Sequence, residues 1–205
     1  MTEAEPSGAP RSNLRDVQRE TTRALLIEAA VRVFARDGYA GATVNAISAE
    51  AGASRATFYL HFRTKADVLP ELVARSGHRL LGRYLDLGPL IDPPDRAALE
   101  GWVRESIRRW PEIEDDMRPV YEAADADPEL FGRLFPDDLP GSANLAEALG
   151  AAGIGVDAED TAMRAAVMHA PMYYLLRRRL RREQFDPDRA AVAIAAAWMG
   201  VLRDR

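Results

Sequence analysis

Residues 43 to 62 combine side chains that can contact nucleic acid. The run reads TVNAISAEAGASRATFYLHF, in which two segments each begin at a hydroxyl residue, Thr43 and Ser54, and Gly52 lies between them. Hydroxyl side chains accept hydrogen bonds from the free N–H groups of a first helical turn, so they mark helix starts. Glycine allows the backbone to turn sharply. The run therefore predicts two short helices joined by a tight turn.

The second of these helices carries the side chains best suited to reading DNA. Ala56 and Phe58 are expected to face inward. The outward positions are then Arg55, Thr57, Tyr59 and His61. A guanidinium can donate two hydrogen bonds to O6 and N7 of guanine in the major groove. In helix-turn-helix proteins the start of the second helix contacts the base edges. The same layout also occurs in helical proteins that do not bind DNA, so a scaffold role stays open here.

The elements around this motif are predicted to be helical. Apolar residues at three- and four-residue spacing give residues 20–37 one buried stripe, and Gly38 is suited to end that helix. No strand pattern longer than a few residues occurs, so we expect an all-α fold. Pro171 is expected to kink its helix. Later helices are predicted at residues 64–73, 95–109, 112–124, 127–134, 142–152, 158–182 and 187–203.

The N-terminal quarter of the sequence resembles the TetR family of bacterial repressors. This resemblance implies a three-helix DNA-binding domain at residues 19–65 and a helical ligand-binding and dimerisation domain at 66–205. The Pro, Gly, Ser and Ala content of the N-terminus predicts a flexible arm before them, at residues 1–18. The matching residues are Phe34, Gly38, Tyr39, Thr43, Ile47, Ala51, Gly52, Ala53, Ser54, Thr57, Phe58, Tyr59, His61, Phe62 and Lys65.

The resemblance also implies roles for individual residues of the motif. Arg55 and Thr57 would read base edges. Lys65, the only lysine in the chain, would contact a backbone phosphate. The other residues implied to contact phosphates are Thr43, Ser54, Tyr59 and His61.

Charge is distributed unevenly along a chain whose net charge is −5. Residues 11–65 hold nine Lys and Arg against five Asp and Glu, a net +4, whereas residues 66–205 hold 18 against 25, a net −7. A basic first quarter is suited to face phosphates. The arginine run at residues 177–182 is instead predicted to be a solvated face, because cations are favoured at a helix C-terminus.

The middle helices contain large and adaptable side chains that could line an apolar cavity. Each of them is also a candidate for ordinary core packing. His169 could orient a ligand or serve as a hydrogen-bonded structural histidine. The predicted ligand-binding residues are Trp102, Trp110, Met117, Tyr121, Phe131, Met168, His169, Met172 and Tyr173, with Phe135 beside them.

The last two helices are predicted to form a four-helix bundle with a second subunit, as the resemblance implies. Small residues alternate with large ones there, which allows helices to approach closely. Packing within one chain is the alternative. A two-fold dimer would bind an inverted-repeat operator. The predicted interface residues are Met163, Val167, Ala170, Tyr174, Ala191, Ile194, Ala195, Trp198, Val201 and Leu202.

Composition argues against several other classes of protein. The chain has no cysteine and three histidines, so we expect neither a metal site nor a cofactor. No phosphate-binding loop or Glu-x-x-His motif supports an enzyme. No apolar run is long enough to span a membrane, and the first ten residues lack an export pattern, which predicts a cytoplasmic protein.

The sequence thus predicts a dimeric DNA-binding regulator, a repressor that a small molecule releases from its operator. The alternatives are a helical carrier or enzyme without a role on DNA, and a protein-interaction adaptor.

Overall fold

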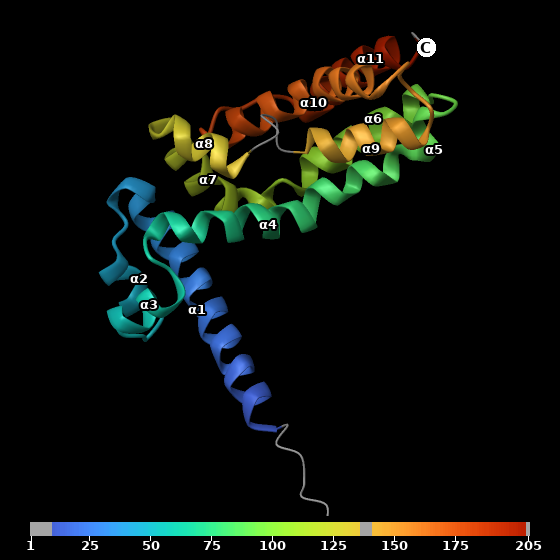
Figure 1. Cartoon of the computed structure of the whole chain (residues 1–205). Helices are drawn as coiled ribbons and strands as arrows, with labels where there is room; N and C mark the ends of the chain where they lie inside the picture. The colour runs from blue at the N-terminus through green and yellow to red at the C-terminus, as the bar shows by residue number, and fades with distance from the viewer. Residues whose placement is uncertain (1–9, 136–140, 204–205) are drawn as a thin grey trace, which may run out of the picture. The chain divides into compact units, whose positions relative to one another are not determined.

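The computed structural model describes residues 10–135 and 141–203, which contain helices and no β-strand (Figure 1). The chain divides into two compact units, residues 1–71 and 72–205. The predicted all-α fold is confirmed. The elements are α1 (Pro10–Gly41), α2 (Val44–Glu50), α3 (Arg55–His61), the 3₁₀ helix η1 (Lys65–Val68), α4 (Leu69–Leu80), the 3₁₀ helix η2 (Leu81–Leu87), α5 (Gly88–Ile91), α6 (Arg96–Arg109), α7 (Pro111–Ala126), α8 (Pro128–Leu134), α9 (Ser142–Ala151), α10 (Ala158–Leu180) and α11 (Pro187–Arg203).

Three expectations differ from this arrangement. Helix α1 begins at Pro10, so residues 10–18 are helical and not a flexible arm, while residues 1–9 lie outside the described part. The first compact unit ends at Glu71, beyond the predicted boundary at Lys65. Residues 81–91 form η2 and α5, which were not predicted because their apolar residues follow no regular helical spacing.

The core of the first unit is built on the predicted stripe of α1. Leu26, Ala29, Ala30 and Val33 are fully buried there, together with Phe34 of the same helix, Ile47 of α2 and Phe58 of α3. Gly38 has a φ of 69° and interrupts the helical backbone of α1, as predicted. The last residues of α1 therefore turn away from its axis before α2 begins.

The second unit packs its last helix against α6. The ring centroids of Trp198 on α11 and Trp102 on α6 are 5.7 Å apart. The Trp198 Nε1 donates a hydrogen bond of 2.7 Å to the backbone oxygen of Met168 on α10. Helices α10 and α11 lie side by side (Figure 1), and α10 continues through Pro171.

No helix in residues 10–135 or 141–203 has the length and apolar composition needed to cross a membrane.

Candidate nucleic-acid interface and cavity

Two hydroxyl caps define the helix pair α2–α3, as the sequence predicted. The Thr43 Oγ1 accepts from the backbone N of Ala46 at 3.1 Å, and the Ser54 Oγ accepts from the backbone N of Thr57 at 3.0 Å. Gly52, in the turn between the helices, has a φ of 65°. Each cap satisfies an N–H group that the first helical turn leaves free. The caps therefore set where α3 starts, and thus which of its side chains face outward.

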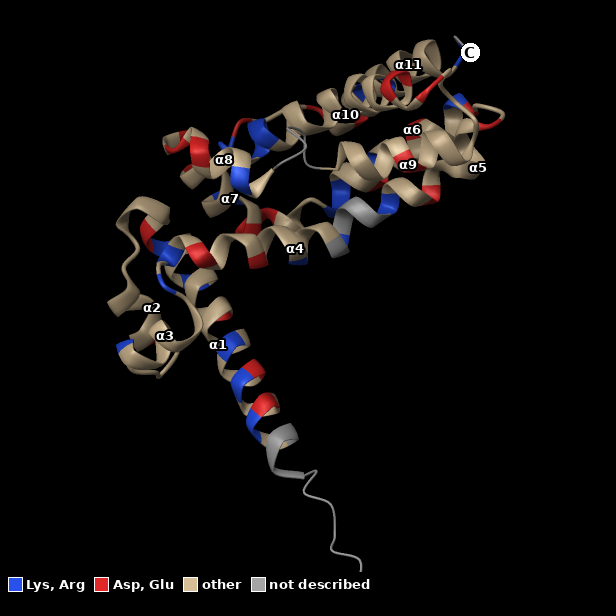
Figure 2. Cartoon of the chain, viewed as in Figure 1, with Lys and Arg blue, Asp and Glu red and all other residues tan. Residues whose placement is uncertain are grey.

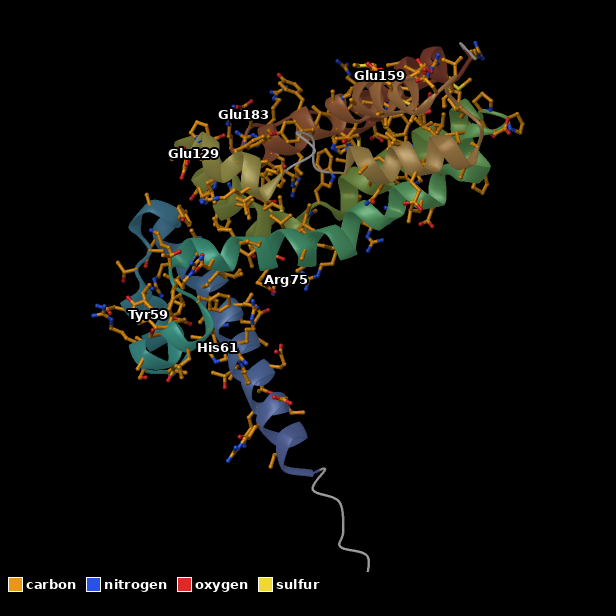
Figure 3. All side chains as sticks on the ribbon, in the orientation of Figure 1. Tyr59, His61, Arg75, Glu129, Glu159 and Glu183 are labelled. Atoms are coloured by element: carbon orange, nitrogen blue, oxygen red, sulfur yellow. The ribbon has the colours of Figure 1, made fainter. Side chains whose placement is uncertain are left out.

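The outward face of α3 presents Arg55 and Tyr59. Arg55 is exposed, and the Tyr59 side chain, on the outer side of α3 in Figure 3, is 48% exposed. The Arg55 Nη2 donates to the Tyr59 hydroxyl at 3.4 Å, and its guanidinium lies 5.9 Å from the centre of the Tyr59 ring. Ala56, expected inside, is exposed, so the start of α3 offers little steric hindrance to an approaching groove. Thr57 is half-buried, and its hydroxyl oxygen lies 2.9 Å from the Ser54 Oγ.

His61 lies on the side of α3 that faces α1 (Figure 3). Burial lowers the pKa of His61, and the positive charges of Arg19 and Arg23 lower it further. The imidazole is therefore neutral at pH 7. A phosphate contact by His61 would use a neutral N–H donor.

Lys65 binds backbone carbonyls of its own chain. Its Nζ donates to the carbonyl oxygens of Tyr39 at 2.6 Å, Ala42 at 2.8 Å and Ala40 at 3.2 Å. It also lies 4.6 Å from the centre of the Tyr39 ring. An ammonium has three donors, and these carbonyls engage all three. Lys65 thus closes the turn between α1 and α2, and its predicted phosphate contact stays a prediction.

Replacing Lys65 by methionine is expected to lower the free energy of unfolding by about 1–3 kcal/mol, because three carbonyls lose a charged donor. Urea unfolding of the full chain measures the change. Arg63→Met is the matched control: Arg63 also follows α3, but its side chain is 92% exposed. Unchanged stability of Lys65→Met, with loss of DNA binding, would show that phosphate is the partner that matters.

The second unit contains a small, mainly apolar cavity of about 50 Å³. Seven of the nine predicted ligand-binding residues line it, along with Phe135. They are Trp102, Trp110, Met117, Tyr121, His169, Met172 and Tyr173.

Two predicted ligand-binding residues lie elsewhere. Phe131 is half-buried on α8 and packs against Phe135, with ring centroids 5.2 Å apart. Met168 is buried in the core near Trp198. Sequence reasoning also missed part of the wall. Small and aliphatic residues on a helix carry no signal that separates a cavity wall from ordinary core, and Tyr84 lies in η2, which was not predicted. The missed residues are Val73, Ser76, Gly77, Tyr84, Ser106, Ile113 and Leu176.

A buried polar pair lies in the cavity wall. The Tyr84 hydroxyl and the His169 Nδ1 are 2.7 Å apart, and both side chains are buried. Burial raises the pKa of Tyr84 well above its usual value, so the phenol stays protonated. This hydrogen bond favours the structural interpretation of His169 over a free ligand-orienting group.

The predicted dimer residues separate into two groups. Met163, Val167, Ala170 and Tyr174 of α10 are exposed, and Val201 is partly exposed. Five residues of α11 are instead buried inside the chain, on the side that packs against α6, so they have no surface left to offer a partner. A wide apolar stripe predicts burial but does not say against which neighbour. The five corrected residues are Ala191, Ile194, Ala195, Trp198 and Leu202.

The arginine run at the end of α10 is largely neutralised. Arg177 pairs with Asp125, Arg178 with Glu183 at 2.9 Å, and Arg179 with Glu114 at 3.0 Å. These ion pairs support the interpretation of this run as a solvated face, because paired guanidinium groups present little net charge to a phosphate backbone.

Comparison with known proteins identifies the first unit. The family model for bacterial regulatory proteins of the tetR family matches residues 26–72. Residues 26–72 thus carry a DNA-binding domain of the tetR type. The matched range contains α2, the turn and α3, together with the second half of α1. TetR-family proteins are helix-turn-helix transcriptional regulators.

Curated relatives match mainly the N-terminal part. The chain is 34% identical over 127 residues to the HTH-type transcriptional repressor SCO4008 of Streptomyces coelicolor, covering 62% of this chain and 55% of that protein. It is 39% identical over 61 residues to the HTH-type transcriptional regulator SrpR of Pseudomonas putida, covering 30% of this chain and 29% of that protein. The matched region thus spans about half of the length of the first relative and less than a third of the length of the second.

Solved structures share the fold over most of the chain. SmeT, the repressor of the multidrug efflux pump SmeDEF of Stenotrophomonas maltophilia, superposes with a TM-score of 0.59 at 24% identity, covering 85% of this chain and 88% of SmeT. The FadR repressor of Thermus thermophilus, solved with lauroyl-CoA, gives a TM-score of 0.57 at 20% identity, covering 89% and 93%. At these identities the likeness extends to the fold only.

Proposed function

We propose that this protein is a dimeric transcriptional repressor of the tetR family that binds an inverted-repeat operator and is released from it by a small molecule. The observation that carries the DNA-binding part is the exposed pair Arg55 and Tyr59 on a helix whose start is set by the Ser54 cap. A guanidinium held against a phenol at the start of α3 is suited to reach a guanine edge in the major groove.

Selection of bound sequences from random duplex DNA tests this proposal. The selection is made with the full chain near physiological salt, because phosphate contacts weaken steeply as salt rises. We expect an enriched inverted repeat whose half-site centres are about one helical turn, or a multiple of it, apart. If folded, dimeric protein enriches no sequence, with or without a cell extract as a source of corepressor, the proposal is wrong.

The proposed dimer surface is an exposed apolar face on α10 and α11. Met163, Val167, Ala170 and Tyr174 recur at intervals of four, three and four residues, which places them along one side of α10. Met163 and Val167 border the same surface hollow as Gly200 of α11, so the exposed sides of both helices adjoin. Most of α11 carries no charge (Figure 2). The α10–α11 face comprises Met163, Val167, Ala170, Tyr174, Val192, Ala193, Ala196 and Gly200.

Two charges on this face are expected to separate the subunits. In Met163→Glu/Val167→Glu, a two-fold interface would bury four unpaired carboxylates, each costing several kcal/mol. Sedimentation equilibrium at micromolar concentration should then find monomers. Operator affinity should fall because the dimer is lost. Val156→Glu is the control, because Val156 is 82% exposed in a loop outside this face. A double variant that stays dimeric would contradict this assignment.

Helix α4 supplies a route from the cavity to the DNA-binding unit. Ser76 and Gly77 of α4 line the cavity. Arg75 directly precedes them in the chain and binds Asp116 of α7. The next residue of α7, Met117, lines the cavity. The first turn of α4 holds Glu71, which accepts a 2.8 Å hydrogen bond from Arg23 of α1. A ligand that moves Met117 would thus act on an ion pair that fixes α4, provided that it binds two states of the protein with different affinity.

A further inference from the structure

The described residues of the cavity wall in the second unit carry no formal charge. Among the lining residues that the structure describes, the titratable side chains are three tyrosines and His169, and none is Asp, Glu, Lys or Arg. Placing an ion in such a site without a counter-charge is strongly unfavourable. Two guanidinium groups lie near the wall but outside the lining: Arg83 over the Trp102 ring at 5.5 Å, and Arg177, paired with Asp125, over the Tyr121 ring at 4.5 Å.

Aromatic rings and thioethers dominate the rest of the wall. The Tyr84 and Trp102 ring centroids are 5.2 Å apart in one group, and the Tyr121 and Phe135 rings stack at 5.5 Å in another. Ring faces and edges favour flat, aromatic occupants. The cavity of about 50 Å³ holds at most a few waters in this conformation. A ring compound must therefore displace side chains, and Met117 and Met172 are the adaptable ones.

Two polar atoms in the wall make no hydrogen bond with any residue in the described part of the chain: Ser76 Oγ and Trp102 Nε1. Both side chains are more than nine-tenths buried. An indole N–H can only donate, and a buried donor without an acceptor is unfavourable. Three other polar side chains of the wall are engaged within the chain, since Tyr84 pairs with His169 and the Ser106 hydroxyl donates to the Trp102 backbone oxygen.

We propose that the cavity takes an uncharged compound with one or two aromatic rings, whose acceptor oxygen receives hydrogen bonds from Trp102 Nε1 and Ser76 Oγ. This inference rests on the proposed function, because it names the effector class of that regulator. Met117 and Met172 move aside to admit the ring.

Three probes of similar size test the chemistry: benzamide, which is uncharged and carries an acceptor; benzoate, which carries a charge; and toluene, which has no polar atom. Binding to the full chain is followed by ¹⁵N–¹H NMR, in which the Trp102 indole signal is assigned with Trp102→Phe. We expect benzamide to bind at least tenfold more tightly than benzoate and to move the Trp102 indole N–H signal downfield. Toluene should bind without that downfield shift.

Matched variants test the two donors. Trp102→Phe keeps an aromatic ring but removes the donor, and we expect it to weaken benzamide about tenfold while toluene changes less than twofold. Ser76→Ala should weaken benzamide several-fold. Ser106→Ala, at the serine whose hydroxyl is already engaged, should have a smaller effect. Circular dichroism establishes that each variant is folded.

Three results would overturn the inference: benzoate binding as tightly as benzamide, benzamide binding without a change at the Trp102 indole, or no binding of either uncharged ring at millimolar concentration. Operator selection is done without any probe. If the probes fail to bind as expected but the selection enriches an operator, the DNA-binding proposal stands. If the selection also enriches no operator, the proposed regulator function is wrong.

Discussion

Arg55→Ala is expected to reduce operator affinity by between about 30-fold and 10⁴-fold. A bidentate contact between a guanidinium and guanine contributes about 1–3 kcal/mol of discrimination, and a two-fold dimer loses that contact in both half-sites. Arg55 is exposed, and both its hydrogen bond and its ring contact are with Tyr59, so the fold should tolerate the change. Fluorescence anisotropy with the selected operator, at one fixed salt concentration, measures the loss.

The same titrations distinguish base reading from phosphate binding. If Arg55 reads a base, binding to unrelated duplex DNA should change little and the salt dependence should stay the same. If it binds a phosphate, affinity for both DNAs should fall and the salt dependence should become shallower. Arg189→Ala is the matched control, because its side chain is 90% exposed in the second unit. Full operator affinity in Arg55→Ala would contradict the assigned role of α3.

Arg75→Met is expected to have the largest effect on stability, about 3 kcal/mol. The Arg75 Nε donates to the Asp116 Oδ2 at 2.7 Å, and the Asp116 side chain is only 4% exposed. Removing one partner of a buried ion pair leaves an uncompensated charge, which typically costs about 3–5 kcal/mol. Arg79, whose Nη1 lies 3.7 Å from the same carboxylate, compensates part of it. Urea unfolding with a single cooperative transition measures the change.

A second substitution separates the charge effect from packing. Arg75→Met/Asp116→Leu removes both charges, so most of the lost stability should return. Arg104→Met breaks the exposed pair with Asp188 and should change stability by less than about 1 kcal/mol. If Arg75→Met changed the free energy of unfolding as little as Arg104→Met, the Arg75–Asp116 pair would not stabilise the fold as proposed.

The double variant also tests the proposed coupling through α4. It should bind the operator like the native protein, but a ligand in the cavity should change its operator affinity less. A double variant whose response to ligand is unchanged would show that the Arg75–Asp116 pair stabilises the fold without transmitting ligand binding.

The sequence alone was enough to predict the features of this protein that depend on neighbours a few residues apart. The caps at Thr43 and Ser54, the turn at Gly52 and the break at Gly38 all follow from short-range hydrogen bonding and backbone sterics. Helical spacing of apolar residues predicted α6 to α11 to within a few residues, because one turn of helix brings residues three and four apart together. The family resemblance rested on these same local residues.

Only the tertiary structure decided which partner each side chain meets. The carbonyls that bind Lys65 lie more than 20 residues before it in the chain. The apolar stripe of α11 meets α6 of its own chain, and the outer side of α10 stays exposed. The cavity wall takes Ser76 from α4 and Trp102 from α6. Helical periodicity shows that a face will be buried, but long-range packing selects the surface that buries it.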